Sequence, residues 1–294
     1  MTPSVLELFT VKPPESFFES SRRVEDSKIV VVGFPYDSTS SFRVGSRYAP
    51  SAIRRYTCGL EGYCWELDLE VSEIPIADAG DLVVVHGDTA KTLKRLGDVV
   101  EELKSMEKVV TTVGGEHTLT LSAFKSCRAD GLVVFDAHMD FRDEYPCGQR
   151  LSHATWLKRL CESFDPSKVV VVGVRAVCKD ELREAKRLGL TFISMKEYRE
   201  RGLKAFRDAI SSMKGSIYVS VDVDVLDPAY APGVSNPEPL GFTLAELLEH
   251  VWALRGLKIA GFDVVEVCPP YDNGCACACA SKILLDLACL AWLS

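Results

Sequence analysis

The amino-acid sequence predicts a three-layer α/β/α fold around a mostly parallel central sheet of about eight strands. The chain has 294 residues, of which 47% are hydrophobic and 26% are charged, as in soluble globular proteins. Short runs rich in Val and Ile alternate with amphipathic stretches, and this order favours a parallel sheet with helices on both faces. Because no Pro/Ser-rich linker or internal repeat divides the chain, we expect residues 1–294 to form one domain.

The predicted strands are continuously apolar rather than alternating, which is typical of strands that are buried on both faces of a sheet. They are bounded by Gly, Pro or Asp, which are common where regular structure ends. In chain order they are Lys28–Gly33, Lys108–Val113, Gly131–Asp136, Lys168–Val174, Thr191–Ser194, Ser216–Asp224 and Leu257–Val267.

Helices are predicted between these strands, where apolar residues recur at helical spacing. In the segment Asp88–Met106, for example, Leu93, Leu96, Val100 and Leu103 lie close to that spacing. The other predicted helices are Thr118–Lys125, His153–Glu162, Asp180–Leu188, Lys196–Met213, Thr243–Leu254 and Cys277–Leu293.

Charge and hydropathy argue against nucleic-acid and membrane binding. The formal net charge is -8, and the sequence has no basic face or tail. The segment Met1–Phe18 contains Glu7 and Glu15 and lacks the basic and apolar regions of a targeting sequence. The longest apolar stretch, Ile283–Leu293, contains Asp286 and is expected to be too short to span a bilayer. We therefore expect a cytoplasmic protein.

Two further features of the composition concern stability. The chain has one Gln and two Asn, and this scarcity of thermolabile amides predicts a thermophilic source. Its eleven cysteines cannot all pair, because their number is odd. Some of them could still form disulfides, because intracellular proteins of hyperthermophiles tolerate these bonds. Cys275, Cys277 and Cys279 alternate with Ala, which is not zinc-site spacing, so we interpret them as small residues buried at a helix start. A disulfide or redox role is the alternative.

Carboxylate and imidazole side chains gather at or just past the carboxyl ends of three predicted strands. Ligands of open parallel sheets bind at that edge. Because alternate residues of an extended chain point the same way, the side chains of each strand end can converge. The set consists of His117, Asp136, His138, Asp140, Asp222 and Asp224.

This set predicts a site for two metal ions. Carboxylates held close together without a cation would repel one another, and their pKa values would rise. Four carboxylates and two imidazoles suit two divalent cations, and oxygen-rich sites with some nitrogen favour Mn²⁺. The alternative is that these residues end turns or cap helices, and we favour it for Asp227, which precedes Pro228. It is a poor account of six such residues together, because Asp and His are rarely buried without partners.

Several motifs carry a resemblance to a known family. They are Gly45–Arg54, Gly114–His117, Asp136–Asp140, Ser220–Pro228, Ala231–Gly233 with Pro237–Pro239, and Gly261–Val267. Together they resemble the ureohydrolases, which include arginase and agmatinase, and the resemblance runs from about Val31 to about Asn273. Ala49 stands where the family usually has Gly. The resemblance implies an arginase-like fold.

The resemblance also implies roles for the metal ligands. Asp136 and Asp222 would bridge two Mn²⁺ ions. The remaining ligands would be His117 and Asp140 for one ion and His138 and Asp224 for the other.

Two further residues are implied to act on the substrate. Glu266 would hold the guanidinium group by paired hydrogen bonds, a geometry that suits a carboxylate and a planar guanidinium. His153, in a segment similar to the family's His-Gly-Thr with Ala154 in place of Gly, would contact the substrate. With Asp140 it would deliver a proton to the leaving amine, a task that suits histidine. The alternatives are a salt-bridged residue for Glu266 and a surface residue at a helix start for His153.

The segment Asp140–Tyr145 is more similar to agmatinases than to arginases. Asp143 and Glu144 would repel the carboxylate of arginine and could receive the distal ammonium of agmatine, although Arg142 and Arg150 complicate this charge argument. A solvated acidic loop is the alternative. The implied reaction is hydrolysis of agmatine to urea and putrescine, in polyamine biosynthesis. Because Val234–Asn236 replaces a common Thr-Gly-Thr, aminopropylagmatine, arginine, guanidinobutyrate and formiminoglutamate remain alternative substrates.

Other functional classes are less well supported. A non-catalytic metal-binding homologue would lack one or more ligands, whereas all six are present. Deacetylases share the architecture but use one zinc ion and lack the paired Asp-x-Asp. His86 and His250 are interpreted as structural or solvated. The resemblance further implies a homo-oligomer, either a trimer or a hexamer.

Overall fold

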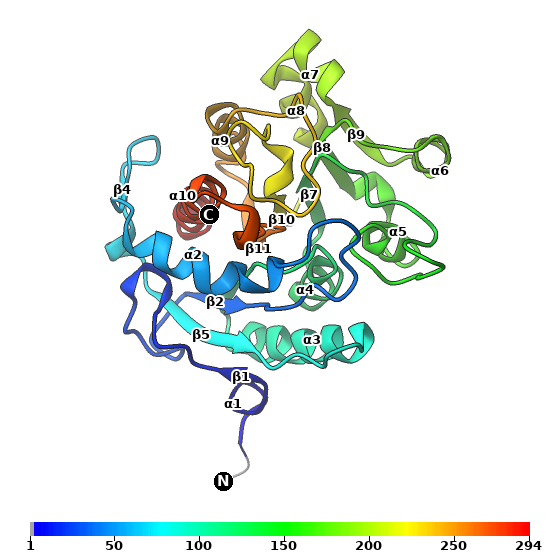
Figure 1. Ribbon diagram of the computed structural model, residues 1–294. Coiled ribbons are helices and arrows are strands. Elements are labelled where there is room, and N and C mark those ends of the chain that lie inside the picture. Colours follow the sequence, from blue (N-terminus) through cyan, green and yellow to red (C-terminus); the bar gives the residue numbers. More distant parts are fainter. Residues whose placement is uncertain (1–2) are drawn as a thin grey trace.

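A nine-stranded sheet forms the centre of the molecule in the computed structural model, which describes residues 3–294 (Figure 1). The strand order is β1-β5-β2-β6-β11-β10-β7-β8-β9, and only the β1–β5 pair is antiparallel. The predicted mostly parallel sheet is therefore confirmed. The strands are β1 (Thr10–Val11), β2 (Ile29–Gly33), β5 (Ile76–Leu82), β6 (Val109–Val113), β7 (Gly131–Phe135), β8 (Val169–Val174), β9 (Thr191–Ser194), β10 (Ser216–Asp222) and β11 (Lys258–Val265).

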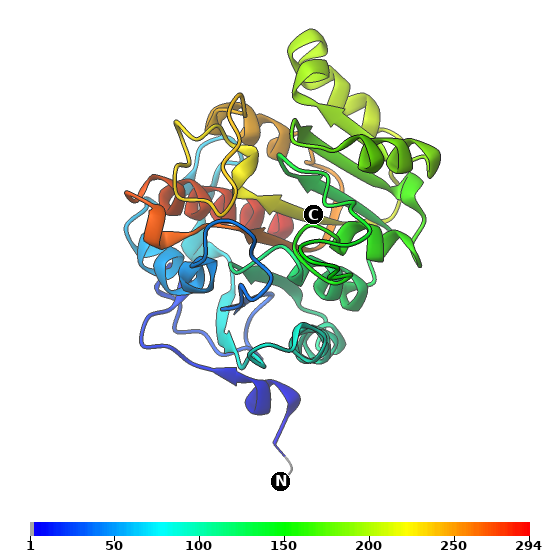
Figure 2. The same ribbon diagram turned by 45° about the vertical axis from the view of Figure 1, so that its right-hand side comes forward.

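Helices cover both faces of this sheet, so the predicted three layers are also confirmed (Figure 2). Alternate residues of one strand serve the two layers: Ile29 and Val31 of β2 belong to one core cluster, and Val30 and Val32 belong to the other. One face carries α3 (Thr89–Ser105), α4 (Leu119–Cys127), α5 (Trp156–Cys161) and α6 (Lys179–Arg187). The other carries α2 (Ala49–Cys58), α7 (Met195–Arg201), α8 (Leu203–Ile210), α9 (Leu244–Trp252) and α10 (Cys275–Leu293).

The N-terminal part of the chain lies along one edge of the sheet (Figure 1, Figure 2). Near the N-terminus, α1 (Val5–Phe9) leads into β1 at the edge of the sheet, and a separate hairpin, β3 (Tyr63–Cys64) with β4 (Leu69–Glu70), lies outside it. Residues 1 and 2, which belong to the segment Met1–Phe18 assessed for targeting, lie outside the described residues. One sheet thus takes strands from both ends of the chain, and the single domain over residues 1–294 stays a prediction.

Two predicted helices differ from the structure. The segment Lys196–Met213 forms α7 and α8 rather than one helix, because Gly202 between them has φ 60° and ψ -157°. The segment His153–Glu162 becomes helical only at Trp156, so His153 lies in the turn before α5.

The C-terminal helix α10 corrects the expectation that its apolar stretch is too short to span a bilayer. It begins at Cys275 and has 19 residues, enough by length and composition to cross a membrane. However, 78% of its most apolar window is buried inside the molecule, which is how a core helix of a soluble protein passes the same test. Cys277 and Cys279 are buried as predicted, whereas Cys275 is exposed, and all eleven cysteines carry free thiols.

Candidate active site

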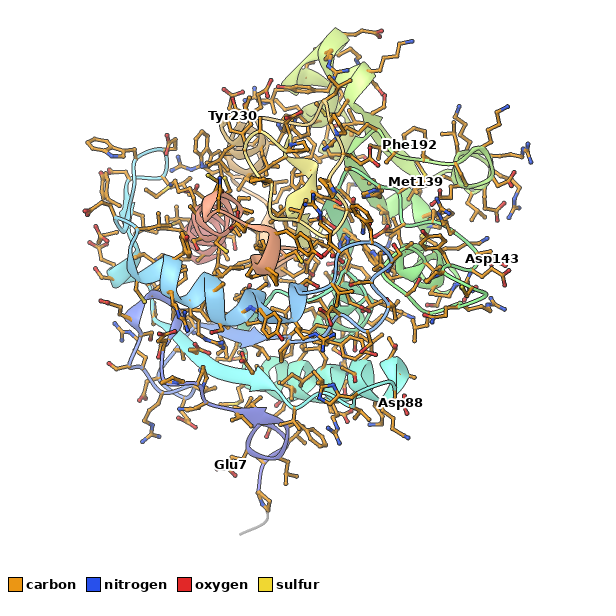
Figure 3. All side chains as sticks on the ribbon, in the orientation of Figure 1. Glu7, Asp88, Met139, Asp143, Phe192 and Tyr230 are labelled. Carbon is orange, nitrogen blue, oxygen red and sulfur yellow. The ribbon has the colours of Figure 1, made fainter. Side chains whose placement is uncertain are left out.

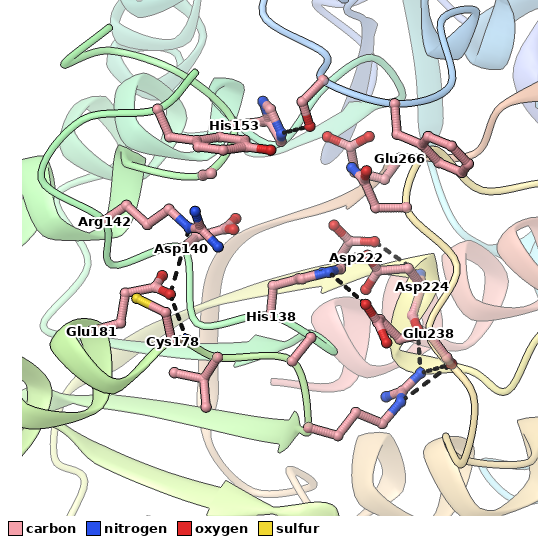
Figure 4. Close-up of a pocket in the computed structure, with 18 of the residues that line it drawn as sticks. His138, Asp140, Arg142, His153, Cys178, Glu181, Asp222, Asp224, Glu238 and Glu266 are labelled. Atoms are coloured by element: carbon pink, nitrogen blue, oxygen red, sulfur yellow. Dashed lines mark hydrogen bonds and ion pairs between the residues drawn. The ribbon is translucent and has the colours of Figure 1, made fainter. Parts of the chain in front are cut away.

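A cavity of about 610 Å³ lies beyond the carboxyl ends of the sheet strands (Figure 4). The strands β6, β11, β10 and β7 are neighbours in the sheet, so the residues that follow them meet at one edge. The residues that line this cavity include His138, Asp140, Asp222, Asp224 and Glu266. Segments far apart in the sequence are therefore brought to one place, as the strand-end pattern predicted.

The turn after β6 depends on glycine. Gly115 has φ +75°, and a Cβ there would lie 2.2 Å from the carbonyl oxygen of Phe34 and 2.6 Å from that of Tyr36. Only glycine allows this close approach of two backbones. The turn carries His117 into the interior, where its side chain is 1% exposed.

His117 faces three carboxylates. Its Nδ1 lies 3.1 Å from an oxygen of Asp136, 3.2 Å from one of Asp140 and 3.4 Å from one of Asp222. On the far side of the ring, Nε2 lies 2.9 Å from the hydroxyl of Ser220.

The hydrogen bonds on the far side of the His117 ring indicate what kind of group fits between Nδ1 and the three carboxylates. The Ser220 hydroxyl donates its proton to Asp263 across 2.6 Å, so its oxygen accepts a hydrogen bond from Nε2–H of His117. When the ring is neutral, it presents the Nδ1 lone pair to the carboxylates, and Nδ1 has no hydrogen-bond partner within residues 3–294. Lone pair and anions repel unless a positive charge lies between them, so the arrangement fits a divalent cation.

A second group of ligands adjoins the first. His138 places Nδ1 2.9 Å from Asp224 and 3.6 Å from Asp136. Two sets, His117–Asp136–Asp222 and Asp136–His138–Asp224, each bring their ligand atoms within 4.8 Å of one another and could each hold a metal ion. Because Asp136 belongs to both sets, two ions held there would be neighbours.

The pKa values of the cluster reflect the same need for positive charge. Burial opposes protonation of His117 and His138, but the adjacent carboxylates raise the pKa of both rings well above the usual range. Burial raises the pKa of Asp140 to about 7, with a contribution from the charge of Asp136. Burial and the neighbouring carboxylates also raise the pKa of Asp222 well above its usual range. The carboxylates would thus share protons if no cation were present.

Glu266 directly follows β11 and lines the cavity. Its backbone lies in the left-handed region, with φ 66°, which a non-glycine residue adopts at some cost and often at functional sites. Its Oε1 accepts from the backbone N–H of His117 across 2.7 Å. Its buried Oε2 has no hydrogen-bond partner among the described residues. Burial raises the pKa of Glu266 to about 8.

His153 lies on the cavity wall rather than on the molecular surface. It is 7% exposed, and its Nε2 lies 3.1 Å from the Ser41 hydroxyl (Figure 4). The ring of Tyr145 is 6.1 Å away in an edge-on arrangement. Burial lowers the pKa of His153 to about 4, and the charge of His138 adds to this effect. The ring is therefore neutral at neutral pH.

Asp143 and Glu144 are not brought to the cavity. The Asp143 side chain is 62% exposed at the edge of the molecule, where it pairs with Arg159 at 2.8 Å and Lys158 at 3.2 Å (Figure 3). The acidic residues that do line the cavity beyond the metal cluster and Glu266 are Glu181 and Glu238. The expectation that Asp143 and Glu144 face the substrate therefore does not match this structure, although Arg142 and Tyr145 of the same segment line the cavity.

Sequence reasoning missed several residues that support the site. The indole N–H of Trp156 donates to Asp140 across 2.7 Å, and Glu116, within the motif that supplies His117, binds Thr39 and Thr118. Arg175 donates to backbone carbonyls on both sides of the cavity wall, including those of residues 224 and 238. Glu238 lies within the Pro237–Pro239 motif, and this motif was the one feature of the sequence that pointed to it.

Asp227 has the structural role that was predicted for it. Its carboxylate accepts from the backbone N–H groups of Ala229, Leu240 and Gly241. It thereby holds the loop that follows β10 and does not line the cavity.

Comparison with known proteins finds relatives over most of the chain. Residues 27–289 match the model of the Arginase family. The chain is 34% identical over 284 residues to an agmatinase of Bacillus cereus, covering 94% of this chain and 96% of the relative. It is 35% identical over 246 residues to an N(1)-aminopropylagmatine ureohydrolase of Thermococcus kodakarensis, covering 83% of each. The solved structure of an agmatine ureohydrolase of Thermoplasma volcanium superposes with a TM-score of 0.88 at 31% identity, covering 96% of this chain and 95% of that one.

Proposed function

The chain belongs to the arginase family and is a hydrolase that acts on guanidino groups, and within that family we propose that it converts agmatine to urea and putrescine with two Mn²⁺ ions. The observation that carries this proposal is Glu266, which lines the cavity beside the carboxylate cluster and whose buried Oε2 has no hydrogen-bond partner among the described residues. A guanidinium N–H would supply the missing donor.

We propose His117, Asp136, His138, Asp140, Asp222 and Asp224 as the ligands of the two ions. The donor set of imidazole nitrogens and carboxylate oxygens suits Mn²⁺. When bound, the two ions supply the charge that makes a water nucleophilic at neutral pH. Because Asp136 belongs to both sets of candidate ligands, it would serve both ions.

The protein's own residues have separable tasks in this proposal. Glu266 accepts hydrogen bonds from the guanidinium and sets the orientation of its carbon toward the carboxylate cluster. Asp140, which Trp156 holds by a hydrogen bond, helps to move a proton away from the attacking water. His153 then passes that proton from Nε2 to the departing amine nitrogen. One water is consumed, one C–N bond breaks, and urea and the free amine leave.

The charges of the cavity wall support an amine rather than a carboxylate at the distal end of the substrate. Arg142 lines the cavity, but its guanidinium lies 3.6 Å from Glu181 and 4.4 Å from the centre of the Tyr145 ring. Its charge is therefore already partnered. The Glu238 carboxylate accepts no hydrogen bond from described residues, and its one close contact with a basic side chain among them is with Nε2 of His138, 3.9 Å away. We propose that Glu238, in place of Asp143 and Glu144, receives the distal ammonium.

The cavity also accommodates a longer polyamine tail. Its volume of about 610 Å³ lies within the range of ligand pockets for larger small molecules. Aminopropylagmatine is therefore the second candidate substrate, supported by the Thermococcus kodakarensis relative.

Urea release by the Mn²⁺-loaded protein tests the proposal. Agmatine, aminopropylagmatine, arginine and guanidinobutyrate would be compared at equal concentration and elevated temperature, with formiminoglutamate assayed for formamide. Turnover of agmatine or aminopropylagmatine well above the others is the expected result. A preference for arginine would overturn the assignment of the distal site, and turnover of none would overturn the proposed reaction.

We further propose that the protein assembles as a homo-oligomer, either a trimer or a hexamer. Apolar side chains such as Trp65, 81% exposed, and Leu240, 67% exposed, support buried contacts between copies. Light scattering of the purified protein gives the mass directly, and a monomeric mass would contradict this proposal.

A further inference from the structure

A buried chain of hydrogen bonds connects Glu116 to His153 through Thr39. The Thr39 backbone N–H and hydroxyl both donate to the Glu116 carboxylate, each across 2.7 Å. The Thr39 hydroxyl oxygen in turn lies 3.0 Å from the backbone N of His153 and 3.4 Å from its Nδ1. Glu116 is 0% exposed and Thr39 is 4% exposed, so water does not compete for these contacts.

The polarity of this chain determines which nitrogen of His153 carries the proton. A hydroxyl has one proton, and that of Thr39 is directed to the Glu116 carboxylate. The Thr39 oxygen can therefore only accept from His153, once from the backbone N–H and once from Nδ1–H. With the proton on Nδ1, the lone pair is on Nε2, where the Ser41 hydroxyl can donate to it across 3.1 Å.

We infer that Glu116 acts through Thr39 to hold His153 in the Nδ1–H tautomer, with the Nε2 lone pair at the wall of the cavity. Glu116 and Thr39 are thus positioning residues, and this inference rests on the proposed function, in which His153 carries the proton. The tautomer matters because only an unprotonated Nε2 can take up a proton near the substrate and then release it to the leaving amine. Ser41 lines the same cavity, so Nε2 is the nitrogen on the substrate side.

Thr118 provides a matched control, because it binds the same Glu116 carboxylate. The Thr118 hydroxyl also donates to Glu116 across 2.7 Å and is also fully buried, but none of its hydrogen bonds reaches His153. A Thr118→Val variant therefore removes an equivalent bond from Glu116 without touching the His153 contact. Thr39→Val removes the acceptor of Nδ1–H, and Thr39→Ser keeps it.

The test reads the tautomer directly by NMR. The protein would be labelled with ¹⁵N-histidine and loaded with Mg²⁺, which does not broaden signals as Mn²⁺ does, and the His153 signals would be identified by their loss in His153→Asn. Native protein, Thr39→Ser and Thr118→Val are expected to show a protonated Nδ1. Thr39→Val is expected to shift His153 toward the Nε2–H tautomer, and thermal unfolding of each variant would confirm that it is folded.

Kinetics with Mn²⁺ give a second readout. Replacing a residue that orients a metal-ligating histidine typically costs on the order of 10-fold to 100-fold, and we take the same size of effect for a residue that orients His153. We expect that loss in the kcat of Thr39→Val with little change in KM, recovery in Thr39→Ser, and a much smaller effect in Thr118→Val.

Several results would overturn the inference: an Nε2–H tautomer in the native protein, an unchanged tautomer in Thr39→Val, or an equal shift in Thr118→Val. Failure of the proposed function has a different signature. In that case no guanidino substrate is turned over by the native protein, while the NMR measurement still reports the tautomer.

Discussion

The indole N–H of Trp156 donates to the carboxylate of Asp140 across 2.7 Å, and both side chains are buried. The Trp156 ring also lies 4.6 Å from the imidazole of His117, measured between ring centres. One side chain of α5 therefore contacts two residues of the proposed metal cluster, and it restricts the directions in which both can turn.

Replacing Trp156 by Phe is expected to weaken Mn²⁺ binding by about 10-fold to 100-fold, the usual cost of removing a partner that orients a metal ligand. The Phe side chain keeps most of the packing but cannot donate to Asp140. Calorimetric titration with Mn²⁺ measures the affinity. Trp292→Phe, at a partly exposed position near the C-terminus, is the control and should bind like the native protein. Equal affinities for both variants would contradict the prediction.

Replacing Asp222 by Ala is expected to lower both the bound Mn²⁺ and the activity, the latter by on the order of 100-fold or more, because a lost ligand costs more than a lost outer partner. Metal content by atomic emission and urea release under the same conditions measure the two effects. Asp143→Asn, outside the cavity, is the control. An Asp222→Ala protein that keeps two Mn²⁺ and full turnover would refute the ligand assignment.

Replacing Glu238 by Gln is expected to raise the KM for agmatine. A hydrogen bond to a charged group contributes about 1.5–3 kcal/mol, which corresponds to roughly a 10-fold to 100-fold weaker interaction. Steady-state kinetics test this, with Glu144→Gln as the control that removes an acidic group from the loop outside the cavity. If Glu144→Gln raised KM as much as Glu238→Gln, the assignment of the distal site would be wrong.

Replacing Arg54 by Met is expected to destabilise the fold by about 3–5 kcal/mol, because it leaves buried carboxylates without their cation. Arg54 is fully buried, pairs with Asp78 at 2.8 Å and with Asp81 at 2.7 Å, and lies over the ring of Phe17. Urea denaturation measures the free energy of unfolding. The adjacent Arg55, which is 67% exposed in its pair with Glu15, supplies the control, and Arg55→Met should cost about 1 kcal/mol or less.

Replacing His250 by Phe is expected to make stability less sensitive to acid. Burial lowers the pKa of His250, which packs among Phe206, Phe242 and Tyr198. As the pH falls through the usual histidine pKa of about 6.5, the unfolded chain takes up a proton that the folded chain refuses, so the native protein loses stability. The difference in unfolding free energy between native and variant protein, measured from neutral pH downwards, should therefore shrink or reverse below about pH 6.5. Parallel curves would show that His250 does not contribute.

The strand-end pattern predicted the ligand cluster because it depends on backbone direction alone. Strands β6, β7 and β10 were identified from their apolar runs, and parallel strands end at a common edge. In contrast, β5 was not predicted, because Asp78, Gly80 and Asp81 interrupt its apolar pattern. Arg54 reaches both carboxylates from α2 and compensates the charge of the buried Asp78 and the partly buried Asp81. Such a pairing between distant segments is not visible in a local window of sequence.

The local sequence also could not predict in which direction the side chains of loop residues point. Asp143 and Glu144 follow a metal ligand in the sequence, so proximity suggested a role at the cavity. Asp143 instead turns toward Arg159 and Lys158 of α5, whose position depends on how that helix packs. Glu238 lies in the loop after β10, and only the folded chain shows that its carboxylate reaches the cavity wall.

The place of β11 in the sheet has a consequence for how the chain is made. This strand is the last of the nine to leave the ribosome, yet it lies between β6 and β10 and joins two groups of four strands. Until Lys258–Val265 emerges, a nascent chain exposes two bare inner edges, which other chains could pair with. Glu266 follows immediately, so a prematurely terminated chain would lack both the strand that closes the sheet and the carboxylate proposed to hold the substrate. Such fragments would be inactive and prone to aggregate.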